Sequence, residues 1–340
     1  MPPFQTPWLK PSDLPGSPRI LDLGDGGPPT TIAGQKVHFI SSSVKLVLQA
    51  RPNVHAADAL DSLADLSADE FDAAVYAPTP AEAKSRVFEW IDGIHDHLRE
   101  GGLFYLGGER HRGVESYCQR VNEVFGETEK VRQVGRRRVY RATKIGPPGA
   151  APVDVRQYID AKIGGDSASF ITRAGVFSRD HVDPGSRKLL EAVRIDRGQT
   201  VLDVGCGYGA IGIFLARRGA SVTMTDVDVR ATRCAQENVD RAGVLGEVHT
   251  ADLFDSVVGR SFDVVVTNPP FHAGHAFAQP FITGAERHLQ TGGRVWLVVM
   301  RDEPYRKLLL EIFGNGGTVA NEGGYSILSA VKKRGSSLGA

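Results

Sequence analysis

The sequence of 340 residues is poor in cysteine and has no excess of either charge. Its three cysteines, Cys118, Cys206 and Cys234, are widely spaced and form no CxxC pair. A disulfide framework or a zinc site is therefore not expected, and a reducing cytoplasm suits the chain. The 40 basic and 40 acidic residues cancel, which argues against binding of nucleic acid through overall charge. Any contact with nucleic acid must come from local basic patches.

No run of apolar residues approaches the length of a membrane-spanning helix. The proline-rich residues 1–18 also lack the basic and then apolar pattern of a secretory signal. These absences predict a cytoplasmic protein with no membrane partner. Apolar residues nevertheless make up 41% of the chain and charged residues 24%, as in ordinary globular proteins.

A segment rich in proline and glycine divides the chain near its middle. Residues 146–153 (GPPGAAPV) offer little to bury, which predicts a linker between domains at 1–145 and 154–340. Both halves alternate short β-rich runs with longer helical patterns. This alternation predicts two α/β domains, each with a mostly parallel sheet of the seven-stranded, Rossmann-like type and helices on both faces.

The pattern is clearest in the second half of the chain. Two helices are expected, one beginning at residues 211–218 and one at 229–242. A closing hairpin is expected at 318–332. Strands are expected at residues 200–204, 221–225, 247–251, 262–267 and 294–300.

Three short matches in the same order indicate that the second half repeats the first. The matched segments are 21–26 (LDLGDG) with 202–207 (LDVGCG), 71–72 (FD) with 262–263 (FD), and 97–102 (HLREGG) with 288–293 (HLQTGG). The last two pairs share one offset, and the first pair differs from it by a short loop. The simplest interpretation is a duplication of one domain.

The two copies differ where polar groups follow the strands. The corresponding residues are Asp226 and Ser41, Asn268 and Ala77, and Phe271 and Pro80. The first half has kept the apolar runs of a sheet and lost the polar groups. We therefore expect a degenerate N-terminal copy that supports the fold or contacts RNA, and one active site in the C-terminal copy.

A glycine-rich turn follows the strand expected at residues 200–204. Gly205, Gly207 and Gly209 would let the backbone turn tightly and approach a ligand closely. Such a loop alone is weak evidence, because it is also compatible with a dinucleotide site or with a turn that binds nothing.

Three acidic residues narrow the choice of ligand. Asp203, Asp226 and Asp252 each follow or end an expected strand, so a parallel sheet would place them at one edge. Asp226 is suited to accept hydrogen bonds from two ribose hydroxyls, and Asp252 to accept from an adenine amino group. The loop has no lysine for a pyrophosphate, which favours S-adenosylmethionine as the cofactor.

The segment Asn268-Pro269-Pro270-Phe271 directly follows the apolar strand expected at 262–267. Two prolines end a strand and stiffen the turn. The side-chain carbonyl of Asn268 and the backbone carbonyl of Pro269 are two acceptors that can hold the hydrogens of one amino group. Phe271 offers a face on which a base can stack. These groups predict transfer of a methyl group to an exocyclic amine; the alternative is a simple proline turn.

His272 and His275 follow this turn and are spaced like two ligands of a metal ion. No third ligand accompanies them in a helix or hairpin, so no metal site is expected. His272 is assigned instead to the substrate loop.

The second half resembles class I methyltransferases, and the whole chain from about residue 14 to 332 resembles bacterial ribosomal RNA guanine-N2 methyltransferases. The segments that carry the resemblance are 175–180 (GVFSRD), 183–190 (DPGSRKLL), 204–212 (VGCGYGAIG) and 267–272 (TNPPFH), with 108–110 (GER), 113–114 (GV) and 124–126 (VFG) in the first half. The resemblance implies methylation of a guanine in ribosomal RNA, and the GVFSRD segment favours the 16S RNA of the small subunit.

The resemblance also implies roles for individual residues. Phe177 and Ser178 would close over the methionine end of the cofactor, while Asn268 and Phe271 would handle the guanine. Asn268 is placed in contact with both cofactor and guanine.

RNA would be held by local basic clusters, since a target base must leave its stack to react. The densest cluster is Arg136, Arg137 and Arg138, which we assign to the substrate, although a solvated strand surface is the alternative. The expected partner is ribosomal RNA or the small subunit, and the enzyme is expected to be a monomer. Other functions that fit are guanine-N2 methylation of 23S RNA, adenine-N6 methylation of nucleic acid, and a non-catalytic assembly factor that binds RNA.

Overall fold

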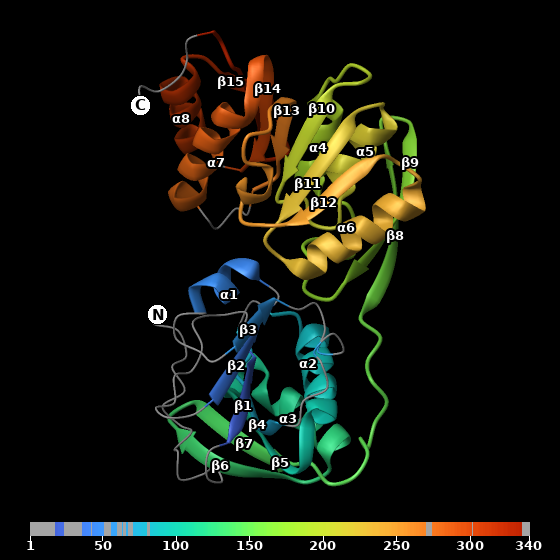
Figure 1. The fold of residues 1–340 in the computed structure, drawn as a ribbon, viewed down its shortest axis with the longest axis vertical. Coiled ribbons are helices and arrows are strands. Elements are labelled where there is room, and N and C mark those ends of the chain that lie inside the picture. Colours follow the sequence, from blue (N-terminus) through green and yellow to red (C-terminus); the bar gives the residue numbers. More distant parts are fainter. Residues whose placement is uncertain are drawn as a thin grey trace. The chain divides into compact units, whose positions relative to one another are not determined.

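The computed structural model describes residues 18–23, 36–41, 43–50, 56–59, 63, 66, 71–79, 82–269, 274–300 and 302–334. The chain divides into two compact units, residues 1–155 and 156–340, coloured blue to green and green to red in Figure 1. The segment expected as a linker is bonded to the first unit. The Gly149 amide donates to the Val124 carbonyl at 2.9 Å, and Arg120 Nη2 donates to the Ala151 carbonyl at 2.7 Å.

The first unit is built around one sheet with the strand order β3-β2-β1-β4-β5-β7-β6. Strand β7 is antiparallel to β5 and β6, and the other pairs are parallel. Its strands are β1 (Arg19–Leu23), β2 (Lys36–Ser41), β3 (Ala56–Ala59), β4 (Phe71–Tyr76), β5 (Leu98–Glu109), β6 (Thr128–Val134) and β7 (Arg137–Thr143). Its helices are α1 (Val44–Ala50), α2 (Lys84–His97), η4 (Arg110–Arg112) and α3 (Val114–Phe125).

The second unit has a sheet with the same topology, in the order β12-β11-β10-β13-β14-β16-β15. Its strands are β10 (Thr200–Val204), β11 (Ser221–Asp226), β12 (Gly246–Thr250), β13 (Phe262–Thr267), β14 (Leu289–Val299), β15 (Gly317–Glu322) and β16 (Tyr325–Val331). Its helices are α4 (Pro184–Ala192), α5 (Ala210–Arg217), α6 (Val229–Ala242), η5 (Asp255–Val257), α7 (Gly274–His288) and α8 (Glu303–Phe313), and a separate hairpin joins β8 (Arg156–Ile163) to β9 (Asp166–Arg173).

The two sheets share irregularities as well as strand order. The ladder between β4 and β5 shifts register between Phe71 and Ala73, and that between β13 and β14 shifts between Phe262 and Val264. In each sheet an aspartate after that phenylalanine accepts a hydrogen bond at 2.8 Å from the first backbone amide of the central strand. β-Bulges are conserved within protein families, so the same bulge at the matching position of both sheets supports duplication of one domain. The predicted tandem α/β fold is confirmed.

Apolar side chains cover both faces of the second sheet, as expected for central parallel strands. Val201, Val264 and Val266 pack on one face with α4, α5 and α6. Leu202 and Val265 pack on the other with α7 and α8 (Figure 1). This double burial explains why residues 264–266 form an unbroken run of valine.

The expected elements of the second half agree with the observed ones to within a few residues. The strands at 200–204 and 262–267 and the helix at 229–242 form as predicted. The sequence did not reveal the β8–β9 hairpin. Asn238 on α6 anchors that hairpin: its side chain exchanges two hydrogen bonds with the backbone of Ile171 at 2.7 and 2.9 Å and donates to the Tyr208 carbonyl at 2.9 Å.

Gly284 gives a test of the packing between α7 and the η5 region. Replacement of a glycine inside a helix by alanine normally stabilises the folded protein by about 0.5–1 kcal/mol. Here a Cβ atom would lie 2.3 Å from the ring of the buried Phe254, which itself stacks on His288. We expect Gly284→Ala to lower the thermal unfolding midpoint, since overpacking costs about 1–3 kcal/mol.

The matched control is Gly317→Ala at the start of β15, where a Cβ would meet no atom within 4 Å. Differential scanning fluorimetry of both variants is the measurement. An unchanged or raised midpoint for Gly284→Ala would show that the described packing is wrong.

Candidate active site

The turn between β10 and α5 is bonded to the end of β11. The backbone amides of Gly205 and Cys206 both donate to the Thr225 carbonyl, at 2.8 and 3.0 Å. Gly205 and Gly207 have φ angles of 72° and 57°, in the left-handed region that favours glycine. A Cβ at Gly207 would meet no protein atom within 4 Å, so the loop borders open space. Burial raises the pKa of the Cys206 thiol, which suits a packing role.

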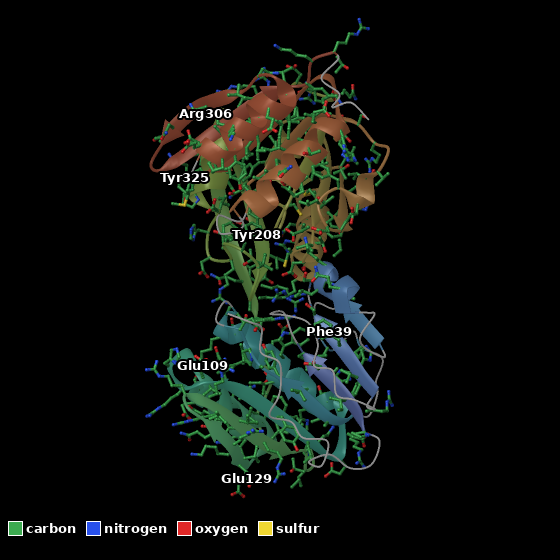
Figure 2. The ribbon with its side chains drawn as sticks, turned by 90° about the vertical axis from the view of Figure 1, so that its left-hand side faces the viewer. Phe39, Glu109, Glu129, Tyr208, Arg306 and Tyr325 are labelled. Atoms are coloured by element: carbon green, nitrogen blue, oxygen red, sulfur yellow. The ribbon has the colours of Figure 1, made fainter. Side chains whose placement is uncertain are left out.

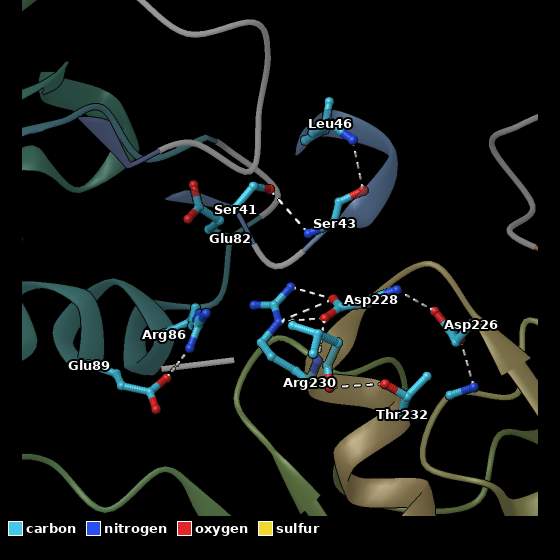
Figure 3. A network of polar contacts seen from close by, with 12 residues as sticks. Ser41, Ser43, Leu46, Glu82, Arg86, Glu89, Asp226, Asp228, Arg230 and Thr232 are labelled. Atoms are coloured by element: carbon cyan, nitrogen blue, oxygen red, sulfur yellow. Dashed lines mark hydrogen bonds and ion pairs between the residues drawn. The ribbon is translucent and has the colours of Figure 1, made fainter. Parts of the chain in front are cut away.

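Asp226 ends β11, and each of its two carboxylate oxygens accepts a hydrogen bond from a backbone amide (Figure 3). Its Oδ2 accepts from Gly207 at 2.8 Å and its Oδ1 from Asp228 at 2.9 Å. Desolvation raises the pKa of Asp226 to about 6, although these bonds oppose the shift. Asp228 caps α6 and pairs with Arg230 at 2.6 Å, which fixes the start of that helix.

Asp203 on β10 is fully buried. Its Oδ2 accepts from the Gly212 amide at 2.9 Å, but its Oδ1 has no hydrogen-bond partner among the residues that the structure describes. Desolvation raises the pKa of Asp203 to about 7, and the charge of Asp226 adds to the shift. A buried acceptor without a donor is costly unless a ligand supplies one.

Asp252 lies beside Asp226 at the same sheet edge. The Ala251 amide donates to the Asp226 carbonyl at 2.9 Å, and the Thr225 hydroxyl donates to the Leu253 carbonyl at 3.0 Å. The structure therefore brings Asp203, Asp226 and Asp252 to the carboxyl ends of adjacent strands, where ligands bind in open α/β sheets.

Asn268 follows β13 at that edge and is half-buried. Its Nδ2 donates to Asp183 Oδ2 at 2.7 Å and to Ser186 Oγ at 2.8 Å. Its Oδ1 is buried and has no partner among the described residues. Both amide hydrogens are thus committed to protein, and the remaining function of this side chain is to accept a hydrogen bond.

The segment from Gly175 to Asp183 lies along the glycine loop and α6. The Tyr208 hydroxyl, in the loop, donates to the His181 carbonyl at 3.3 Å; Figure 2 labels this tyrosine. Gly175 leaves no room for a Cβ, which would lie 2.3 Å from the Arg230 guanidinium. In this segment Phe177 is 57% exposed and Ser178 has a φ of 53°, with its hydroxyl bonded to His181. An exposed phenylalanine on a fixed loop is free to cover a ligand.

The turn that follows Asn268 also holds expected site residues, and only the first of them belongs to the described part of the chain. Pro270, Phe271 and His272 are outside the described residues. Pro269 is buried directly after Asn268.

The arginine cluster lies on the first unit, at the turn before β7 and on that strand. Arg137 pairs with Glu109 at 3.4 Å and Arg138 pairs with Glu115. Arg141, further along β7, pairs with Glu129 at 2.6 Å; Figure 2 labels this glutamate and Glu109. Acidic neighbours therefore compensate the charges of Arg137 and Arg138, two of the three arginines assigned to the substrate.

The sequence reasoning did not find the contacts of Asp183, Ser186 and Tyr208. Asp183 had a local signal, because aspartate followed by proline is typical of a helix start, and its side chain does accept from the Ser186 amide. Its contact with Asn268 spans 85 residues and had no such signal.

The described residues fit S-adenosylmethionine. Asp203 Oδ1, which has no partner in the described part of the chain, is a potential acceptor for an amino group, Asp226 and Asp252 bring two more carboxylates to this edge, and the open space beside Gly207 admits a ligand. No set of three metal-binding side chains occurs in the described part of the chain. No described helix is long and apolar enough to cross a membrane.

Comparisons with known proteins agree with this geometry. The methyltransferase small domain family matches residues 167–329. Ribosomal RNA small subunit methyltransferase C from Escherichia coli is 33% identical over 243 residues, which cover 70% of this chain and 69% of that protein; the Shigella dysenteriae protein gives the same values.

Among solved structures, the Thermus thermophilus 16S rRNA N2 G1207 methyltransferase, in complex with AdoMet and guanosine, superposes with a TM-score of 0.83. It is 29% identical, and the match covers 94% of this chain and 89% of that one.

The repeated sheet and the acidic, glycine-rich sheet edge define a two-domain class I methyltransferase with a polar site in its second domain. The sequence identity to the Escherichia coli protein, and the share of both chains that it covers, also establish the family. The chain belongs to the ribosomal RNA small subunit methyltransferase C family, which confirms the family expected from the sequence.

Asp203 gives a prediction about pH. Its folded pKa of about 7 lies above the ordinary value of 3.8, so the folded protein holds this proton more tightly than the unfolded chain. Folding stability from Asp203 is therefore lost as pH rises from about 4 to about 7. We expect Asp203→Asn to unfold at a higher temperature than the parent at pH 8 in the absence of cofactor, with the difference shrinking toward pH 4.

The measurement is the thermal midpoint of both proteins across this range. Asp226 titrates in both proteins, so only their difference reports on Asp203. Parallel profiles would mean that Asp203 is not buried as described.

Proposed function

We propose that this chain transfers the methyl group of S-adenosylmethionine to the exocyclic N2 amine of a guanine in 16S ribosomal RNA. The position that corresponds to G1207 of the Thermus relative is the expected target. The observation that carries the proposal is the buried Oδ1 of Asn268, which has no partner among the described residues and lies at the sheet edge that also holds Asp203, Asp226 and Asp252. An acceptor-only group beside a cofactor crevice is suited to hold an amino group.

Five side chains would hold the cofactor, together with the turn at Gly205 and Gly207. Asp226 accepts from the ribose hydroxyls, Asp252 from the adenine amine and Asp203 Oδ1 from the amino group of the methionine part. Phe177 and Ser178 cover the methionine end. Bound S-adenosylmethionine supplies an electrophilic methyl group on a positively charged sulfur.

Asn268 orients the acceptor nitrogen. Its Oδ1 accepts one N2 hydrogen, the Pro269 carbonyl accepts the other, and the lone pair is thereby directed toward the methyl group. Phe271 stacks on the guanine and His272 borders it. The new N–C bond forms as the S–C bond breaks, and the positive charge that develops on nitrogen is stabilised by the two carbonyl oxygens. The nitrogen then releases one proton to solvent, so no strong base is needed.

The partner is ribosomal RNA, and we propose the small subunit as its physiological form, a cytoplasmic location and a monomeric enzyme. The arginine cluster at residues 136–138 remains a proposed RNA contact on the first unit. Its ion pairs with Glu109 and Glu115 would have to open or be shared with phosphate.

Asn268→Ala tests the function. Removal of one preorganised polar group from such a site typically costs about 100- to 1000-fold in turnover. We expect this loss in transfer of labelled methyl groups to 16S RNA or small subunits, with cofactor affinity by calorimetry unchanged.

Nuclease mapping of the parent's product should place the label on guanine N2. Label on adenine N6 or on 23S RNA would contradict the proposal. An Asn268→Ala variant that restores a deletion strain fully would instead favour a binding-only role.

A further inference from the structure

The amide of Asn268 has a fixed orientation, and Asp183 is the group that fixes it. An asparagine amide can turn over and exchange its oxygen and nitrogen. Asp183 Oδ2 and Ser186 Oγ both contact Nδ2, at 2.7 and 2.8 Å. An ionised carboxylate can only accept, so it excludes the flipped amide, whereas a hydroxyl would tolerate either orientation.

The N-terminus of α4 holds Asp183 itself in place. Asp183 Oδ2 also accepts from the Ser186 amide at 2.9 Å, and both residues are buried. A Cβ at Gly185 would lie 2.9 Å from Asp183 Oδ2 and 3.0 Å from the Tyr325 ring, so a glycine at this position leaves the carboxylate its place beside the helix end. The amide therefore contacts a rigid helix end.

We propose that Asp183 and Ser186 are positioning residues that lock Asn268 as a hydrogen-bond acceptor and thereby select an amino group as the methyl acceptor. This inference rests on the proposed function. A flipped Asn268 would present two hydrogens and favour a carbonyl or ring nitrogen of a base. The locked amide instead favours the N2 edge of guanine over its O6 and N7 edge.

Three single variants separate this role from helix capping. Ser186→Ala keeps the amide that caps α4 and removes one acceptor, so we expect kcat to fall about 10-fold. Asp183→Ser keeps a capping oxygen but permits the flip, so a larger fall is expected. Asp183→Asn keeps both a cap and an acceptor oxygen and should retain more activity than Asp183→Ser.

Exchanging the partners gives the sharpest test. Asn268→Asp alone would set two carboxylates against each other and abolish turnover. Combined with Asp183→Asn, the repulsion between two carboxylates is removed, and one carboxylate oxygen still faces the acceptor. The introduced amide can serve the Ser186 amide with its oxygen or position 268 with its nitrogen, because Asp183 Oδ2 is the acceptor for both. We expect the double variant to recover at least about 10-fold in kcat over Asn268→Asp, because contacting residues are coupled in a double-mutant cycle.

Cofactor affinity, KM for small subunits and thermal midpoint are measured for every variant. Ser329→Ala is the control, because it also removes a buried hydroxyl, one that accepts from Arg294 at 3.3 Å in the same unit. Unchanged kcat in Asp183→Ser and Ser186→Ala would overturn the inference. If Asn268→Ala is itself fully active, the proposed function has failed instead.

A separate observation concerns a cavity of about 580 Å³ between the β8–β9 hairpin and the ends of α5 and α6. Lys162, Arg217 and Arg241 line it and are exposed. Arg217 Nη1 donates to the Ser167 carbonyl. Asp160, the acidic residue of the lining, accepts from the Ser169 hydroxyl. Within the described ranges, no acidic side chain lies within ion-pair distance of the three cations.

Tyr158 lies next to this cavity. It is 64% exposed on β8, and the Arg241 guanidinium lies 6.0 Å from its ring centre. Unpaired cations beside an exposed aromatic ring suit a nucleic-acid backbone with a neighbouring base. This arrangement contrasts with Arg137, Arg138 and Arg141, which are paired with glutamates.

We infer that this cavity binds backbone phosphate of the ribosomal RNA substrate, an inference that also rests on the proposed function. Lys162→Glu combined with Arg241→Glu should weaken binding of 16S RNA in filter assays. The slope of log affinity against log salt should fall by about two, and KM should rise with kcat unchanged.

The control reverses two exposed cations on α8, Arg306→Glu with Lys307→Glu (Arg306 is labelled in Figure 2). Equal losses in both double variants would indicate only a general charge effect and overturn the inference. So would unchanged RNA binding with a lowered thermal midpoint, because the cations would then serve only the helix ends. Absence of any RNA methylation by the parent would refute the proposed function itself.

Discussion

The parallel pairing of three central strands is the constraint on which the site depends. Strand β10 lies between β11 and β13 in register, with Asp203 opposite both Met224 and Val266. Residues that follow these strands, far apart in sequence, therefore meet at one edge. The glycine turn completes this edge because its amides bond to β11 rather than to their own helix. A one-residue slip in either pairing would move every side chain to the opposite face of the sheet.

The site carries buried polar atoms that have no hydrogen-bond partner among the described residues. Asp203 Oδ1 and Asn268 Oδ1 are both buried and unpartnered among the described residues, and desolvation raises the pKa of Asp203 to about 7. Such atoms reduce the stability of the free protein. Their placement suits a site in which Asp203 binds an amino group of one ligand and Asn268 binds an amino group of another. The first unit repeats the sheet and its bulge but has Ser41 and Ala77 at the positions that match Asp226 and Asn268, so it keeps the fold without those two polar groups.

Rigidity around Asn268 links the architecture to specificity. The N-terminus of α4 orients the amide, the Tyr208 bond holds the preceding segment, and Asn238 ties the hairpin to α6 and to the glycine loop. Each bond is of ordinary strength. Together they fix the amide nitrogen of Asn268 and leave its oxygen to accept a hydrogen bond from the substrate. A preorganised acceptor of this kind distinguishes chemically similar edges of a base.

The sequence by itself determined the local elements and the chemistry of the strand ends. Runs of valine, the spacing of glycines and the acids after each strand were enough to predict β10, α6, β13 and the cofactor crevice, because period and turn chemistry are local properties. The tertiary structure alone decided the partners of those groups. The contact of Asp183 with Asn268 spans 85 residues, and the glutamates that pair with Arg137 and Arg138 lie on other elements. Such pairings follow from how distant segments pack, which no local pattern encodes.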